Sequence, residues 1–405
     1  MHGARFRLPS RAAWSNPMDL TTLTYVFLLA IGFLGFDAAI HTPDTILEAE
    51  AIGTFDKTTV NAGLVNDVMS QTVQEISATP TVMTRPVIRV GRLQGLAMSL
   101  AQSVKMESVA YALQAQLGYR PDEIKISLYG EGGTARALVT GTGHQRMTSF
   151  QQQLSLEPGE TMVDLVQRAT MVGMAHVDPY ITALNEMQKH ANDKDFTHAE
   201  TIITYAMAGL PPTPENFERS LFENLNGLIA LFKGDANAAR DWFLRAEDSC
   251  PDNTLADAVT SVNAAFADIQ TDHDQLAVDH IQMLLRDKPP TDKVLLGTAY
   301  MTLAAAQLGV NDAKGADRSI AKSIEAYPEG SSAYDLWADV KREQGDTAEA
   351  DRLHEKALEK SVSFENYSEI AALYFRLAWR ENQPVMRSPF SNPTLGGVHA
   401  TKRGS

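Results

Sequence analysis

The sequence predicts a mainly α-helical chain of stacked helix pairs, preceded by a small α+β domain and an apolar N-terminal segment. Three observations lead to this fold class. Residues 220–251 contain two short segments of helical apolar spacing, divided at Gly234 and ended by Pro251. Similar segments recur as far as residue 380, and residues 20–36 contain no charged side chain. Helix pairs this short cannot bury their apolar faces alone, so they are expected to stack on one another.

Composition limits the classes of function. The 405 residues include 35 Lys and Arg against 50 Asp and Glu, a net charge of −15. A chain this acidic argues against a nucleic-acid partner, because phosphate contacts need a basic face. The single cysteine, Cys250, excludes an intramolecular disulfide and a cysteine-based zinc site.

The N-terminal region has the charge pattern of a signal anchor. Arg5, Arg7 and Arg11 precede the apolar run, and only acidic charges follow it up to residue 50. We expect residues 1–17 to stay in the cytoplasm and 18–40 to cross a bacterial inner membrane once, with the later domains in the periplasm. A cleaved signal peptide, a buried helix and an organellar transit segment are the alternatives.

Residues 44–175 are expected to form a compact α+β domain with a partly antiparallel sheet. Two glycine-rich stretches, 130–133 and 141–143, lie between expected strands, where they suit hairpin turns better than phosphate-binding loops. No catalytic residue is predicted. The expected elements are strands at 46–55, 87–90, 124–129, 134–140 and 147–156, helices at 58–76, 93–117 and 161–174, and turns at 131–133 and 141–144.

One cluster of metal-binding residue types occurs in the helical region. Asp272, His273, Asp274, Asp279 and His280 lie close together in sequence. Polar residues at the start of a helix are commonly solvated or cap it, so we expect no metal site here. No cofactor is predicted for any part of the chain.

Small residues recur at fixed places in the helix pairs. When Ser220 is counted as the first place, Gly227, Ala239, Phe243 and Ala246 fall at the eighth, twentieth, twenty-fourth and twenty-seventh. This pattern resembles the tetratricopeptide repeat (TPR), a 34-residue helix–turn–helix unit. The resemblance implies an α-solenoid of about five helix pairs over residues 176–381, ended by a capping helix at 365–380. The other copies begin at Tyr180, Ala258, Gly297 and Ser331.

The TPR resemblance also implies a concave groove lined by the first helix of each pair. The residues at its ligand-contacting places are apolar in the middle and acidic toward the C-terminal end, which suits a peptide with apolar anchors. The alternative, that several of them form the core between repeats, stays open. The groove candidates are Asn224, Leu228, Leu231, Val262, Phe266, Met301, Asp335, Asp339 and Arg342.

The expected function is that of a membrane-anchored scaffold, not an enzyme, that binds a protein or peptide partner on the periplasmic side. The whole arrangement resembles single-pass bacterial membrane proteins with periplasmic repeats, a group without an established activity. A ligand-sensing or enzymatic α+β module with the repeats as an accessory is one alternative. A homo-oligomeric structural subunit of a membrane complex is the other. Residues 382–405, rich in proline and glycine, are expected to be disordered.

Overall fold

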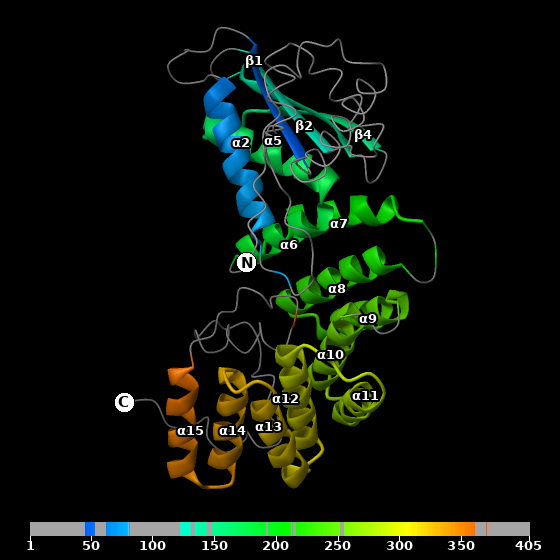
Figure 1. Ribbon diagram of the computed structural model, residues 1–405, viewed down its shortest axis with the longest axis vertical. Coiled ribbons are helices and arrows are strands. Elements are labelled where there is room, and N and C mark those ends of the chain that lie inside the picture. The colour runs from blue at the N-terminus through cyan, green and yellow to red at the C-terminus, as the bar shows by residue number, and fades with distance from the viewer. Residues whose placement is uncertain are drawn as a thin grey trace, which may run out of the picture. The chain divides into compact units, whose positions relative to one another are not determined.

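The computed structural model describes twelve helices and four strands (Figure 1). The chain divides into two compact units. The sheet unit comprises residues 1–73 and 88–173, and the helical unit comprises residues 74–87 and 174–405. The mainly helical fold with a small sheet is confirmed. The described residues are 45–52, 62–79, 81, 122–130, 134–143, 148–191, 193–211, 213, 216–251, 255–360 and 370.

The sheet unit contains a four-stranded mixed sheet in the order β1-β2-β3-β4. The first two strands are parallel, and the other neighbouring pairs are antiparallel. Alternating burial along β2 places Ile124, Ile126 and Leu128 on the covered face. The partly antiparallel meander is therefore confirmed. The strands are β1 (Thr45–Ile52), β2 (Asp122–Tyr129), β3 (Arg136–Gly143) and β4 (Thr148–Ser155).

Helices α2 (Ala62–Ser77) and α5 (Met162–Val177) run beside this sheet (Figure 1). The apolar stripe expected for the first helix is buried, as Val65, Met69 and Val73 show. Gly173 lets α5 approach β2, because a Cβ atom at this position would lie 2.6 Å from the Ile124 side chain. Both helices thus supply the apolar layer that covers one face of the sheet.

The second glycine-rich stretch is not a turn, which corrects the expectation for residues 141–144. Residues 141–143 continue β3, where Gly141 pairs with Ile124 of β2 and Phe150 of β4. A Cβ atom at Gly141 would lie 2.0 Å from the Glu123 carbonyl oxygen and 2.8 Å from the Phe150 ring. The glycine is needed because the neighbouring strand and ring approach closely, which the sequence pattern does not distinguish from a turn.

Between residues 179 and 359, the described part of the helical unit contains five successive antiparallel helix pairs. Each pair has a first and a second helix. In chain order they are α6 (Pro179–Lys189) with α7 (Thr197–Ala208), α8 (Phe217–Phe232) with α9 (Ala236–Ser249), α10 (Leu255–Gln270) with α11 (Asp274–Asp287), α12 (Lys293–Gly309) with α13 (Ala313–Ala326), and α14 (Ser331–Glu343) with α15 (Thr347–Glu359).

A glycine followed by an aspartate forms the tight turn between the two helices in the second and fifth pairs. Gly234 has a φ of +85° after α8, and Gly345 has a φ of +84° after α14. Glycine adopts this left-handed conformation without the steric penalty that a Cβ atom would bring, so it can end the first helix here. The next residue, an aspartate in both pairs, begins the second helix: Asp235 accepts from the Ala238 N–H and Asp346 from the Glu349 N–H.

The two helices of a pair cross closely where small residues meet large ones. Gly227 of α8 lies against Phe243 of α9, and a Cβ atom at this glycine would lie 2.4 Å from the ring. Both residues belong to the recurring places that the sequence identifies. In the fourth pair, Ser323 of α13 donates a 2.6 Å hydrogen bond to the Gly297 carbonyl of α12. Close approach of backbones is therefore a shared feature of these pairs.

Several expected segments lie outside the described residues. They are the N-terminal segment at 1–17, the membrane anchor at 18–40, the strand at 87–90, the helix at 93–117, the turn at 131–133, the tail at 382–405 and, apart from Ile370, the capping helix at 365–380. Among the helices that the structure describes, none combines the length and the apolar character needed to span a bilayer.

Replacing Gly227 by alanine is expected to destabilise the helical unit. Phe243 is fully buried, so its ring cannot move aside, and overpacking of this kind costs about 1–3 kcal/mol. Urea unfolding should show this drop in the free energy of unfolding. Gly209→Ala is the matched control, because its new Cβ atom would make only an ordinary 3.5 Å contact. Equal stability of the two variants would contradict a sterically required crossing.

Candidate functional site

The candidate site is the layer formed by the first helices, which we call the inner layer: α6, α8, α10, α12 and α14. Each of these helices packs against the next one in the series. Each second helix also packs against the first helix of the following pair. The inner layer thus has one side turned toward the second helices and one side turned away from them, and the groove predicted from sequence is on the latter.

Helical geometry identifies which α12 residues lie on the side turned away. Gly297 meets Ser323 and Tyr327 of α13, and Gln307 accepts a hydrogen bond from Ser319 of the same helix. Thr298, Thr302 and Ala305 lie on the opposite face at 100° per residue. All three are buried, with 3%, 0% and 4% of their surface exposed.

Helix α10 is covered in the same way. Ser261 and Asp268 point toward α9, where they contact Glu247 and Arg240. The opposite face carries Val259, Asn263 and Phe266, and each is 0% exposed. All thirteen residues from Ala256 to Asp268 are in fact buried. These residues of α10 therefore leave no exposed surface for a groove ligand.

The structure places most predicted groove residues inside this packing. Asn224 of α8 accepts a 2.8 Å hydrogen bond from the Asn263 amide of α10, which is a contact between neighbouring pairs. Their buried side chains match the alternative in which these residues form the core between repeats. An aspartate in place of Leu228 or Phe266 would therefore unfold the layer rather than test binding. The fully or almost fully buried candidates are Asn224, Leu228, Leu231, Val262, Phe266 and Met301.

The three candidates on α14 differ from the others. Asp335 is buried, and its Oδ1 atom lies 3.2 Å from the Nδ1 atom of His354 on α15. Asp339 is half-buried and forms an ion pair with the exposed Arg342, with 3.2 Å between Oδ1 and Nη1. Asp339 and Arg342 are thus the predicted partner-binding residues that remain accessible within the helical unit as described. Their binding role stays a prediction.

A partly buried polar network between the second and third pairs was missed by sequence reasoning. Glu247 of α9 accepts hydrogen bonds from Ser261 of α10 at 2.6 Å and pairs with His280 Nε2 of α11 at 2.9 Å. Arg240 and Asp268 form a second ion pair across α9 and α10. Glu247 and His280 are 33 residues apart, about one repeat, which is the signal that could have indicated their contact.

This network also determines the surroundings of the histidines considered for metal binding. His280 faces Glu247, whereas His273 Nδ1 lies 2.9 Å from the Thr271 hydroxyl. Asp279 accepts a hydrogen bond from Gln275 on its own helix. These side chains take separate partners, and among the described residues no group of three or more acidic, histidine or cysteine side chains is arranged to hold a metal ion.

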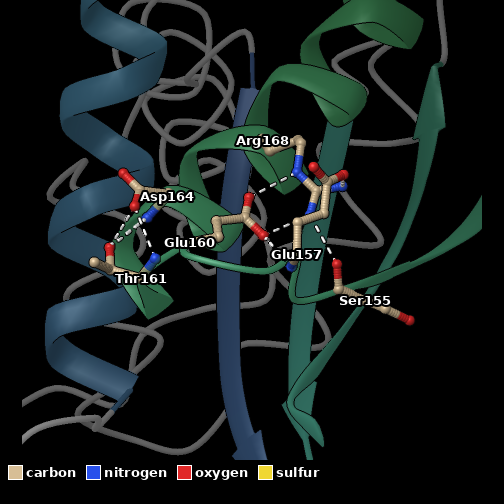
Figure 2. A network of polar contacts seen from close by, with 6 residues as sticks. All are labelled: Ser155, Glu157, Glu160, Thr161, Asp164 and Arg168. Carbon is tan, nitrogen blue, oxygen red and sulfur yellow. Dashed lines mark hydrogen bonds and ion pairs between the residues drawn. The ribbon is translucent and has the colours of Figure 1, made fainter. Parts of the chain in front are cut away.

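The carboxylates at the start of α5 form a polar cluster with Arg168 in the sheet unit (Figure 2). Arg168 makes two 2.8 Å hydrogen bonds to Glu160, one to the Ser155 carbonyl, and a 3.2 Å ion pair with Glu157. The Arg168 hydrogen bond keeps the pKa of Glu160 below its usual value. This carboxyl group is therefore ionised at neutral pH and is poorly suited to act as a general acid.

Thr161 and Asp164 complete the cluster as a capping box (Figure 2). The Asp164 N–H donates to the Thr161 hydroxyl at 3.2 Å, and Asp164 Oδ2 accepts from the Thr161 N–H at 2.8 Å. The hydrogen bond from the Thr161 hydroxyl lowers the pKa of Asp164. These contacts satisfy the N–H groups that begin α5, so the cluster is explained by helix capping.

Comparison with known proteins gives no relative from which a function could be transferred. No family model, no curated protein and no solved structure matches the chain. The function therefore has to be argued from the helix pairs, the inner layer and the sequence pattern.

The ion pair of Glu247 and His280 should make stability depend on pH. Burial lowers the pKa of His280, but the hydrogen bond and charge of Glu247 outweigh it and leave the pKa raised. Burial likewise raises the pKa of Glu247, but His280 outweighs it and leaves that pKa lowered. The ion pair therefore contributes fully to the stability of the folded protein between pH 4.5 and pH 6.5, the ordinary pKa values of a glutamate and a histidine. Its contribution falls as the pH rises through the raised pKa of His280.

His280→Gln tests this dependence, because glutamine can still donate to Glu247 but does not titrate. The loss of unfolding free energy in this variant should be larger at pH 6 than at pH 9 when measured by urea unfolding. His273→Gln, at a histidine outside the Glu247 network, is the control and should show no such difference. An equal loss for His280→Gln at both pH values would contradict the assigned ion pair.

Proposed function

We propose that this protein is a TPR-type scaffold that holds a protein or peptide partner against its helix pairs and has no catalytic role of its own. The observation that carries the proposal is the series of five antiparallel pairs, in which each second helix packs on the following first helix. Such one-dimensional stacks offer an extended surface on which several side chains can contact one peptide.

The resemblance to the TPR is supported by where the recurring residues lie. Gly227 and Phe243 meet at the helix crossing, and Ala239 and Ala246 are fully buried beside them. Prolines follow the second helices at Pro211, Pro251, Pro289 and Pro328, each within three residues of the helix end. A proline cannot continue the helix, so its recurrence marks the same boundary in each pair.

The proposal includes a membrane tether at residues 18–40, with the sheet and helical units in the periplasm. Its support is the uncharged run at 20–36 with three arginines before it and acidic residues after it. A tether would keep the scaffold and its partner near the membrane. Alkaline phosphatase fused at the C-terminus should be active in a bacterial host, since this reporter folds only outside the cytoplasm. An inactive fusion that accumulates to normal levels would exclude the periplasmic placement.

Partner binding is tested through the accessible ion pair on α14. The tagged full chain, crosslinked in membranes, is expected to recover a protein partner, and Arg342→Glu is expected to reduce that recovery. Arg352→Glu is the matched control: Arg352 also pairs with an acid three residues before it, Glu349, but lies on the second helix. Both arginines are exposed and surface ion pairs of this kind contribute only about 0–1 kcal/mol, so neither variant should unfold.

Each result has a distinct meaning. Recovery of no partner by the full chain would count against the scaffold proposal. A partner that both variants retain equally would leave the scaffold in place but exclude Arg342 from the binding surface. Loss in both variants would indicate a general charge effect, which the melting temperature and the salt dependence of recovery would expose.

A further inference from the structure

The outer edge of β4 is a surface of the sheet unit that the proposed scaffold function does not use. Strand β4 is the last in the order β1-β2-β3-β4, so among the described strands it has a neighbour on one side only (Figure 1). An edge strand presents a row of backbone N–H and C=O groups that can pair with a further strand. What this edge can bind depends on which groups point outward and on whether side chains protect them.

The hydrogen bonds to β3 identify the outward groups. The Leu156 N–H donates to the Ala135 carbonyl at 2.9 Å, and this pair continues the register of β3 and β4 without a bulge. In an antiparallel pair of strands, only alternate residues exchange hydrogen bonds with the neighbouring strand. The even-numbered residues of β4 therefore bond β3, and the odd-numbered residues direct their backbone groups away from it. These outward residues are Ser149, Gln151, Gln153 and Ser155.

One of the outward groups already has a partner. Arg168 of α5 donates a 2.8 Å hydrogen bond to the Ser155 carbonyl (Figure 2). This contact agrees with the outward direction of the odd-numbered carbonyls, and it closes the edge at the C-terminal end of β4. For Ser149, Gln151 and Gln153, the described residues provide no hydrogen-bond partner on the outer side. The middle of the edge is therefore available for pairing.

The side chains of β4 do not protect this edge. Natural edge strands are commonly protected by charges, a proline or a bulge. Strand β4 has the sequence TSFQQQLS, without a charge or a proline, and pairs with β3 without a bulge. Strand β1, the opposite edge, carries the exposed Glu48 and Glu50. Two β1 strands would bring like charges together, whereas two β4 strands have no charges to oppose each other.

The apolar layer on the sheet stops short of β4. Gln152 lies beside Val139 on the face that α2 and α5 cover, but Val139 is fully buried and Gln152 is exposed. Phe150 and Leu154 lie on the same face and are only half-buried. Strand β4 thus keeps apolar surface in contact with water at the edge where its outward backbone groups lie.

We propose that β4 pairs antiparallel with β4 of a second copy of this chain, across a two-fold axis at Gln152, to form one continuous sheet. A two-fold interface uses the same surface on both copies, so the strand has to be complementary to itself. Hydrogen bonds require outward groups in both strands, and in this alignment Gln151 faces Gln153 of the partner subunit. Phe150 then lies opposite Leu154 of the partner subunit, which forms an apolar cross-strand pair.

Arg168 limits the length of this pairing. In the same alignment Ser155 faces Ser149 of the partner subunit, and the Ser155 carbonyl is held by Arg168. The paired strands therefore end at this residue on both sides of the axis. The pairing does not rest on the scaffold function, because every residue that it uses belongs to the sheet unit.

A proline at Gln151 tests the pairing. Gln151→Pro removes one outward N–H and keeps the hydrogen bonds between β4 and β3, because proline is tolerated on the solvent side of an edge strand. Sedimentation velocity of the detergent-solubilised full chain should give a dimer for the unchanged protein and a monomer for this variant. Gln151→Val keeps the N–H group, suits a strand and is the matched control that should stay dimeric. A monomeric unchanged chain, or a dimeric Gln151→Pro chain, would overturn the proposal.

A disulfide tests the alignment and does not require the proline variant to fold. In a Cys250→Ser background, Gln152→Cys places two thiols at the axis, in a non-hydrogen-bonded pair with about 4.5 Å between the Cα atoms. Copper phenanthroline should link this variant about tenfold or more faster than Gln153→Cys, whose two Cα atoms would lie more than about 7 Å apart, too far for a disulfide. Equal rates, or no link in either variant, would contradict the proposed pairing.

Discussion

The helical unit depends on how closely the two helices of each pair approach. Gly227 allows the Phe243 ring to lie against the α8 backbone, and in the fourth pair Ser323 bonds directly to the Gly297 carbonyl. One side of the second helix packs closely on the first helix of its own pair. Its opposite side packs on the first helix of the following pair. The inner layer therefore follows from the crossing: first helices come into contact with one another, and polar pairs such as Asn224 and Asn263 can form between them. A buried amide pair adds about 1 kcal/mol and penalises any other alignment of the two helices.

Much of this architecture was predictable because it is local in sequence. The strands β2 and β3 follow from alternation, and the helix pairs follow from apolar spacing, aspartate caps and left-handed glycines. The stretch at Gly141 was misread since a glycine required by a neighbouring strand looks the same as one in a turn. The Glu247–His280 pair was missed because it joins two different helix pairs. Its separation of about one repeat is visible only when successive pairs are compared, not within a single helix.

The groove residues illustrate a different limit. The places at which TPR proteins contact ligands identify which side of the first helix a residue lies on, and Val262, Phe266 and Met301 were chosen by that rule. They do not say whether the side is open. Burial depends on everything else that packs on that surface, and the spacing of residues within one helix does not indicate this. Accessibility on α14, at Asp339 and Arg342, is consequently more informative about partner contacts than the family places alone.

The 2.9 Å hydrogen bond from the Asn185 amide of α6 to the Thr79 hydroxyl has a practical consequence for dissecting the protein. The helical unit includes residues 74–87, and Lys189 of α6 forms a 2.9 Å ion pair with Glu75 from this same stretch. The helical unit is thus not contiguous in the chain. A recombinant fragment that starts near residue 176 would leave the buried Asn185 amide without Thr79, at a desolvation cost of about 1–3 kcal/mol. An expression boundary drawn from the repeats alone would remove part of the unit it intends to isolate, and a circularly permuted or linker-joined chain that keeps residues 74–87 is the sounder starting point.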